Sequence, residues 1–334
     1  MLLEITHETR YDYAAPVSLA HHLAHLRPVD DAHQRLLDFE LQIDPRPGHQ
    51  RIGRDAMGNV ERHFGLSVPH RRLRVRAHSR LDVVDRFGGL QAAVSPPWES
   101  LVERLRYVAR APFVPECEFA MPSPFVPRLA PLRDYAAQSF TPGRPVAEGA
   151  VELMRRIHAD FNYKSRSTEI DTPLAEVWAN KRGVCQDFAH LMAGAMRMLG
   201  LPARYVSGYL LTHAPDGADG ADGQGREMQG ADASHAWVQA WCPGTPGVPD
   251  SGPGAGWLDL DPTNDLIPGC GHVRVAVGRD FGDVTPLRGV IRGGGDHTLS
   301  VAVRTRRTPQ GSSQTQSQSQ LPTSAQAQPR PASC

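Results

Sequence analysis

The sequence predicts an α+β protein, because segments of three kinds follow one another along its 334 residues. Apolar and polar residues alternate with a period of two through residues 1–95, and helical periodicity follows in 146–161 and 185–199. Strand-like segments come after these helices. Helices that precede their strands, instead of alternating with them, are typical of the α+β class.

Residues 1–95 are expected to form a β-rich N-terminal domain, a small sandwich. Turn signals such as Asp44-Pro45 and Met57-Gly58-Asn59 separate its alternating segments, which are 3–13, 36–43, 60–66 and 73–84. Residues 96–145 carry many prolines, which disfavour long regular elements. We therefore expect a connector there, with one short helix near 99–109.

Residues 146–304 are expected to form the second domain. Apolar side chains recur every three or four residues in its two helices, and Gly200 and Pro202 mark the end of the second helix. Strands are predicted at 203–212, 235–241 and 256–261, with polar, Gly-rich loops between them. Residues 305–334 have too little apolar content to fold and are predicted to be a disordered tail.

The composition excludes several classes of partner and site. Lys plus Arg and Asp plus Glu number 36 each, so net charge gives no reason to expect nucleic acid or an anionic membrane. Glu4 lies where a secretory signal peptide would have its apolar stretch, and no later apolar run approaches the length of a membrane span. We therefore expect a cytoplasmic protein. Five irregularly spaced cysteines fit neither a disulfide framework nor a paired zinc site. Cys270-Gly271-His272 is the nearest approach to a metal pair, and we expect neither metal nor cofactor; the oligomeric state stays open.

A candidate nucleophile stands at the predicted start of the second helix. Gly183 brings Cys185 to the first turn, where unpaired N–H groups and the helix dipole favour a negative charge. Such a position lowers the pKa of a thiol from about 8.5 to roughly 3.5–7.5. His190 lies five residues further on, well off the helix face of Cys185, and is therefore a poor candidate for its base.

A base and a carboxylate follow the thiol in chain order. Alternation places His235 on one face of the strand 235–241, and Asp259 and Asp261 share a face of the strand that follows. If these strands are antiparallel neighbours, a carboxylate can fix one imidazole nitrogen and aim the other at Cys185. Asp261 is favoured over Asp259 because it stands at the strand end, where groups of a site are accessible.

Other residues are candidates to hold an oxyanion or to line the site. The backbone N–H of Cys185 is one expected oxyanion donor, and a second is sought just upstream. These additional candidates are Trp178, Asn180, Gln186, Asp187, Tyr209 and Trp237. Asp187 also has a simpler interpretation as a first-turn complement to the helix dipole. Repeated Asp-Gly units in 213–223 leave open a calcium switch, although they lack the ligand spacing of an EF-hand.

Together these motifs resemble the bacterial transglutaminase-like family. The resemblance is carried by Gly183-Val184-Cys185-Gln186-Asp187-Phe188, by Ser234-His235-Ala236-Trp237 and by Asp261-Pro262-Thr263-Asn264. The first 80 residues also resemble the β-rich region that precedes the core in such proteins. The resemblance implies a papain-related core, with a nucleophile helix packed on an antiparallel sheet, in which Cys185 is the nucleophile, His235 the base and Asp261 the orienting carboxylate.

The implied activity is cysteine-dependent acyl transfer on a peptide or protein substrate through a thioester. We expect amide hydrolysis, as in a peptidase or amidase, ahead of protein-glutamine transamidation, which crosslinks proteins. An alternative of another class is a non-catalytic binding module that retains the fold.

Overall fold

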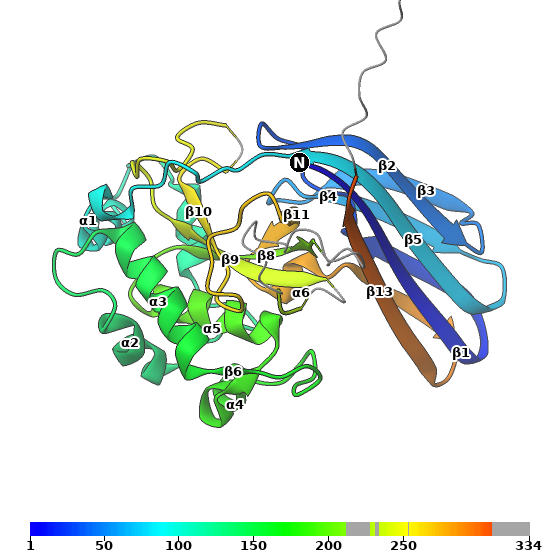
Figure 1. Ribbon diagram of the computed structural model, residues 1–334. Coiled ribbons are helices and arrows are strands. Elements are labelled where there is room, and N and C mark those ends of the chain that lie inside the picture. The colour runs from blue at the N-terminus through cyan, green and yellow to red at the C-terminus, as the bar shows by residue number, and fades with distance from the viewer. Residues whose placement is uncertain (212–227, 231–233, 253, 309–334) are drawn as a thin grey trace, which may run out of the picture.

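The computed structural model describes residues 1–211, 228–230, 234–252 and 254–308 (Figure 1). A curved β-sheet packs beside a mixed core in which helices cover a smaller sheet, so the predicted α+β class is confirmed. Within the described ranges, no helix combines the length and the apolar character needed to cross a bilayer. The predicted loop at 213–232 and the tail beyond 308 lie largely outside these ranges.

The N-terminal region is one antiparallel sheet of seven strands. Its strand order is β2-β5-β1-β4-β3, and two late strands also pair with β1. The N-terminal strands are β1 (Leu2–Ala24), β2 (Gln34–Asp44), β3 (His49–Arg54), β4 (Val60–Leu66) and β5 (His70–Val83). The first half of β1 pairs with β5, and after a register shift between Asp12 and Val17 its second half pairs with β4. The expected two-sheet sandwich is therefore wrong, because one long strand runs through both halves.

The two late strands return to this N-terminal sheet. They are β12 (Leu287–Gly293) and β13 (His297–Arg307), and both run antiparallel to β1. The predicted core, 146–304, thus ends inside β13, and residues 305–307, predicted to belong to the tail, lie in a strand. The pairing is long-range: Arg306 forms an ion pair of 2.8 Å with Glu4. The composition of residues 305–307 alone does not reveal that they pair with β1, and they were therefore predicted to belong to the tail.

The second part of the chain packs helices on a four-stranded antiparallel sheet of order β10-β9-β8-β11. Its strands are β8 (Ala203–Leu210), β9 (His235–Trp241), β10 (Trp257–Leu260) and β11 (His272–Gly278). The helices α3 (Val146–Asp160) and α5 (Cys185–Met198) confirm both helical predictions, and α5 lies against β8 and β9. Since α5 is covered on nearly every side, its methionines 192 and 196 are buried core residues. The strand β11 was not predicted.

The proline-rich connector forms short elements around this core. They are α1 (Trp98–Arg104), a 3-10 helix (Pro115–Ala120) and α2 (Ala130–Ala137), and only α1 corresponds to the predicted helix. Another 3-10 helix (Ala92–Val94) lies just before the connector. Three short elements precede α5 in the chain, namely β6 (Asn162–Tyr163), α4 (Leu174–Asn180) and β7 (Arg182–Gly183), and the short helix α6 (Phe281–Val284) follows β11. The connector helix α2 packs on α5 and completes its burial.

Buried polar contacts join the N-terminal sheet to the core. Asn59 exchanges two hydrogen bonds with the backbone of Val277, at 2.7 and 2.8 Å. The ring of His7 in β1 hydrogen-bonds through Nδ1 to the hydroxyl of Tyr209 in β8, at 3.0 Å. Because a buried polar group is costly when unpaired, these contacts fix how the two parts dock.

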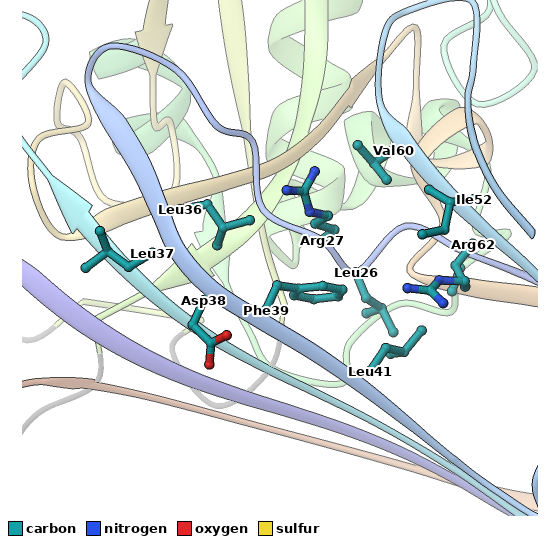
Figure 2. Close-up of a pocket in the computed structure, with 11 residues that line it drawn as sticks. Leu26, Arg27, Leu36, Leu37, Asp38, Phe39, Leu41, Ile52, Val60 and Arg62 are labelled. Atoms are coloured by element: carbon teal, nitrogen blue, oxygen red, sulfur yellow. The ribbon is translucent and has the colours of Figure 1, made fainter.

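A groove of about 430 Å³ opens on the N-terminal sheet. Figure 2 shows apolar side chains of Leu26, Phe39, Leu41 and Ile52 along it, with Arg62 beside them. None of the predicted site residues lines this groove.

Candidate active site

A tight turn places Cys185 as the first residue of α5. The preceding helix α4 ends at Lys181, whose φ of 51° is left-handed, and β7 then leads to the N-cap residue Val184. A Cβ at Gly183 would lie 2.6 Å from Oδ2 of Asp187, so only glycine fits here without a shift. The Asp187 carboxylate accepts hydrogen bonds from the backbone N–H of Val184 (2.8 Å) and the hydroxyl of Thr168 (2.6 Å).

The Cys185 sulfur lies at the N-terminal, positive end of α5, directly after the N-cap residue Val184. The first turn of an α-helix contains N–H groups without partners inside the helix, and these donors suit a negative charge on a sulfur or on an oxyanion. The Cys185 residue is partly exposed, whereas Asp187 is buried. The sequence-based interpretation of Asp187 as a first-turn complement therefore describes its contacts better than a role in lining the site.

The predicted hydrogen bond between His235 and Asp261 is present. The strands β9 and β10 pair antiparallel, with Asp259 opposite Gln239, which brings Asp261 to the His235 end of β9. His235 donates from Nε2 to Oδ2 of Asp261 at 2.9 Å, and both side chains are fully buried. Asp259 is buried too, but its Oδ1 has no hydrogen-bond partner among the described residues.

Asp261 is held by a set of donors from the turn that follows it. Its Oδ1 accepts from the backbone N–H groups of Thr263 (2.9 Å) and Asn264 (3.2 Å), and its Oδ2 accepts from Nδ2 of Asn264 (2.8 Å). The turn sequence Pro262-Thr263-Asn264 thus orients the carboxylate toward the imidazole. These donors favour the ionised form of Asp261.

The electrostatics of the pair favour an imidazolium. Burial raises the pKa of Asp261, but the charges and hydrogen bonds of His235 and His272 outweigh burial and lower this pKa well below its usual range. Burial lowers the pKa of His235, yet the charge and hydrogen bond of Asp261, with a further contribution from Cys185, raise it to about 10. At neutral pH the pair is therefore carboxylate and imidazolium.

The second imidazole nitrogen is free for the thiol. Nδ1 of His235 makes no hydrogen bond within ordinary limits to any described residue, and Cys185 lies near enough to favour the charged ring. Catalytic hydrogen bonds are often long before substrate binds. The structure thus brings together the three groups that the sequence proposed.

His272 is a member of the cluster that the sequence interpretation missed. Its Nε2 lies 3.1 Å from the same Oδ2 of Asp261, and Trp237 packs edge-on against its ring at 5.3 Å. The signal for its position was the alternation of Val273, Val275 and Val277, which marks β11. The sequence had placed His272 beside Cys270 as a weak candidate for a metal pair, whereas the structure shows its ring hydrogen-bonded to Asp261.

The remaining candidates divide into two groups. Trp237 belongs to the site, since its ring stacks on His235 at 6.0 Å and is completely buried. Gln186 donates its side-chain N–H to the carbonyl of Ile170 at 2.9 Å, and Tyr209 bonds to the N-terminal sheet. Their polar groups are therefore engaged away from the imidazole.

The two upstream candidates for an oxyanion donor lie in α4. The ring of Trp178 packs against Tyr135 at 5.3 Å and carries the ammonium of Lys181 over its face at 3.2 Å. Asn180, the last residue of α4, is exposed. These contacts describe an aromatic cluster beside α5 and give no evidence for either residue as a donor to the site.

Burial shifts the pKa of three further titratable groups. His190 is buried, accepts a hydrogen bond from the backbone N–H of Phe281, and has its pKa lowered to about 3 by burial. Burial also raises the pKa of the Cys242 and Cys270 thiols. The four cysteines within the described ranges form no disulfide.

Comparison with known proteins identifies both parts of the chain. Residues 3–82 match the bacterial transglutaminase-like N-terminal region, and residues 133–262 match the transglutaminase-like superfamily. Uncharacterized proteins of Mycobacterium bovis and Mycobacterium tuberculosis are 38% identical over 295 residues, which is 86% of this chain and of theirs. A protein-glutamine gamma-glutamyltransferase of Pseudomonas aeruginosa is 32% identical over 152 residues, 42% of this chain and 19% of that one.

A solved structure shares the fold. It comes from Cytophaga hutchinsonii and is described as a candidate cysteine protease. The two chains superpose with a TM-score of 0.64 at 20% identity, over 92% of each. The predicted family and the predicted arrangement of a β-rich region before a transglutaminase-like core are therefore confirmed.

Proposed function

The chain belongs to the transglutaminase-like superfamily, and from that membership we propose that it is an enzyme that cleaves carboxamide or peptide bonds through a thioester on Cys185. The observation that carries the proposal is the buried 2.9 Å hydrogen bond between His235 and Asp261, next to a thiol at a helix N-terminus. Nucleophile, base and orienting carboxylate are the three parts that activated-thiol catalysis requires.

In the proposed reaction the Cys185 thiolate attacks the carbonyl carbon of the substrate. The carbonyl oxygen becomes an oxyanion, which the backbone N–H of Cys185 stabilises. The His235 imidazolium then gives its Nδ1 proton to the departing amine as the carbon–nitrogen bond breaks, which leaves a thioester and a neutral ring. The Nε2 proton stays on the hydrogen bond to Asp261, because that carboxylate is the far weaker base.

The nucleophile that resolves the thioester decides the product. If neutral His235 takes a proton from water, the attack releases a carboxylic acid and restores the thiolate–imidazolium pair, and the enzyme is an amidase or peptidase. If it takes a proton from an amine such as a lysine side chain, the product is a new amide. We propose hydrolysis; the Pseudomonas relative, a protein-glutamine gamma-glutamyltransferase, supports transamidation as the second candidate.

One experiment separates the two reactions. The purified protein is incubated with glutamine-containing peptides and a fluorescent primary amine, and the products are resolved by mass spectrometry. Hydrolysis predicts free acid or cleaved peptide without incorporated amine. Amine incorporation without free acid would replace hydrolysis by transamidation, and Cys185→Ala serves as the control for background reaction.

A thiol-reactivity profile separates an enzyme from a binding module of the same fold. Cys185 is expected to react with iodoacetamide well below pH 8, whereas Cys242 and Cys270, whose thiol pKa values are raised by burial, are expected to stay unmodified. Peptide mapping assigns the label to each cysteine. Equal labelling of all three would favour the non-catalytic module.

A further inference from the structure

A second cluster of chemical groups lies where the N-terminal sheet meets the core. Its members are His25, which directly follows β1, Asp55, in the turn between β3 and β4, and Glu61, in β4. Ala24 is paired with Arg62 across β1 and β4, so the antiparallel register continues to set His25 opposite Glu61. One donor atom of each residue lies within 4.8 Å of the others.

The buried His25 ring forms a hydrogen bond through Nδ1 and none, among the described residues, through Nε2. The residue is 1% exposed, and its Nδ1 lies 3.2 Å from the carbonyl oxygen of Thr285. A carbonyl only accepts, so Nδ1 carries the proton and a neutral ring presents a lone pair at Nε2. Among the described residues Nε2 has no hydrogen-bond partner, and it faces the two carboxylates.

The distances fit a cation shared by the three groups better than hydrogen bonds. Nε2 of His25 lies 3.7 Å from Oδ2 of Asp55 and 3.5 Å from Oε1 of Glu61. Hydrogen bonds from an imidazolium would draw these oxygens in to about 2.7–2.9 Å. Ligands about 2.1 Å from a tetrahedral zinc ion stand about 3.4 Å apart, which is close to both distances.

The two carboxylates are held in place by outer partners. Oδ1 of Asp55 accepts from the backbone N–H groups of Met57 and Asn59, at 2.9 Å each, and its Oδ2 accepts from Nδ2 of Asn59 at 2.7 Å. The second oxygen of Glu61 lies 3.0 Å from Nε2 of His63. Metal ligands are commonly oriented in this way, with a carbonyl behind the histidine and donors behind the carboxylates.

We propose that His25, Asp55 and Glu61 bind one divalent ion of the zinc class, through Nε2, Oδ2 and Oε1, with water as the fourth ligand. An imidazole with two carboxylates suits a borderline cation better than magnesium, which prefers six oxygens. The ion joins the end of β1 to the β3–β4 turn. Because Asn59 bonds to Val277 and His25 to Thr285, the same ion also secures the sheet to the core.

The test measures metal binding and stability in the full chain. Protein stripped with EDTA and then dialysed is titrated with zinc chloride, its metal content is measured by mass spectrometry, and its Tm by differential scanning fluorimetry. We expect one zinc ion per chain and a higher Tm. At free zinc about 100-fold above Kd the unfolding constant falls about 100-fold. Magnesium chloride at the same concentration is expected to change Tm much less.

Variants locate the ion. Asp55→Asn and Glu61→Gln keep the side-chain shape and are expected to abolish the zinc-dependent rise in Tm, as is His25→Ala. If His25→Ala does not fold, Glu61→Gln still decides, because Glu61 is partly exposed. The matched control is His49→Ala, which removes an exposed imidazole from the same sheet and should leave the rise intact.

Three results would overturn the proposal. The first is a wild-type Tm that does not respond to zinc while both carboxylate variants lower it, which describes an ion pair of protonated His25. The second is zinc binding that survives Glu61→Gln but is lost in His272→Gln. That result would assign the ion to the buried cluster of His235, Asp261 and His272 instead. The third is loss of binding in the His49 control, which means adventitious surface binding.

Discussion

Replacing Asp261 by asparagine should uncouple the thiol from its base while leaving the fold in place. All five hydrogen-bonding neighbours of the carboxylate can donate, and they come from His235, His272, Thr263 and Asn264. An asparagine must turn its NH2 group toward some of these donors. The hydrogen bond to His235 is therefore weakened or lost, and the negative charge disappears in either orientation.

The magnitude follows from the causes that set the pKa of His235. Burial lowers that pKa, and Asp261 supplies the largest opposing effects that raise it to about 10. Without the carboxylate the pKa should fall below its ordinary value of 6.5. A fall of at least about three pKa units corresponds to about 4 kcal/mol, or roughly a thousandfold change in the ratio of imidazolium to imidazole.

The assay is alkylation of Cys185 by iodoacetamide between pH 5.5 and 10, followed by mass spectrometry, and it needs no knowledge of the substrate. At pH 6.5 the rate for Asp261→Asn should be roughly a hundredfold to a thousandfold below that of the wild type. Some turnover should remain with a substrate, because binding and the oxyanion site persist.

The matched control is Asp259→Asn, which makes the same replacement at the buried aspartate two residues earlier, in β10. Circular dichroism should show that both variants are folded. The reasoning is refuted if folded Asp261→Asn alkylates within a few-fold of the wild type at pH 6.5, or if Asp259→Asn shows the larger loss.

Four further predictions follow from the same geometry. Cys185→Ala should abolish turnover and leave the Tm nearly unchanged, since the side chain is partly exposed and loses one atom; product analysis and fluorimetry test both parts. Gly183→Ala should disrupt the Asp187 cap, because its Cβ would lie 2.6 Å from that carboxylate, and should cost about 1–3 kcal/mol in urea unfolding together with slower alkylation of the thiol. His272→Gln should lower kcat/KM less than Asp261→Asn does, because it removes one partner of the carboxylate and keeps its charge; steady-state kinetics of the two variants give the order, and the reverse order would contradict it. Stability should fall with acidification between pH 6.5 and about 3, because the unfolded chain binds a proton at His190 that the folded chain refuses; each such group contributes a slope of about 1.4 kcal/mol per pH unit. Fluorimetry across this pH range should show that the Tm of His190→Gln falls less steeply with acidification than that of the wild type. An unchanged slope would contradict the role given to His190.

Local patterns predicted most of the core correctly. The helices α3 and α5 and the strands β8, β9 and β10 were predicted from the apolar patterns of their own residues. The structure shows that α5 and these three strands are buried on nearly all sides, which a one-sided apolar pattern does not require. The hydrogen bond from His235 to Asp261 was also predictable. A period of two indicates which side chains share a face, and the neighbouring strands bring His235 and Asp261 together. The accessibility expected of Asp261 at the strand end was wrong, because its side chain is fully buried.

Contacts between distant segments were not predictable in this way. The alternation of β11 is present in the sequence, but that His272 joins Asp261 depends on which strand lies beside β8. The placement of β12 and β13 in the N-terminal sheet likewise depends on pairing with β1, across more than 260 residues. The contacts of Tyr209 with His7 and of Trp178 with Tyr135 likewise join segments that are distant in the sequence.

The sequence by itself determined the family, the class of the core and the three groups of the candidate site, because a capped helix start and two alternating strands are encoded over a few residues each. Only the tertiary structure decided that two imidazoles share one buried carboxylate, and that His25, Asp55 and Glu61 meet at the junction. Those encounters depend on how the curved sheet docks against the core, and docking is set by the summed packing of many residues, none of which carries that information alone.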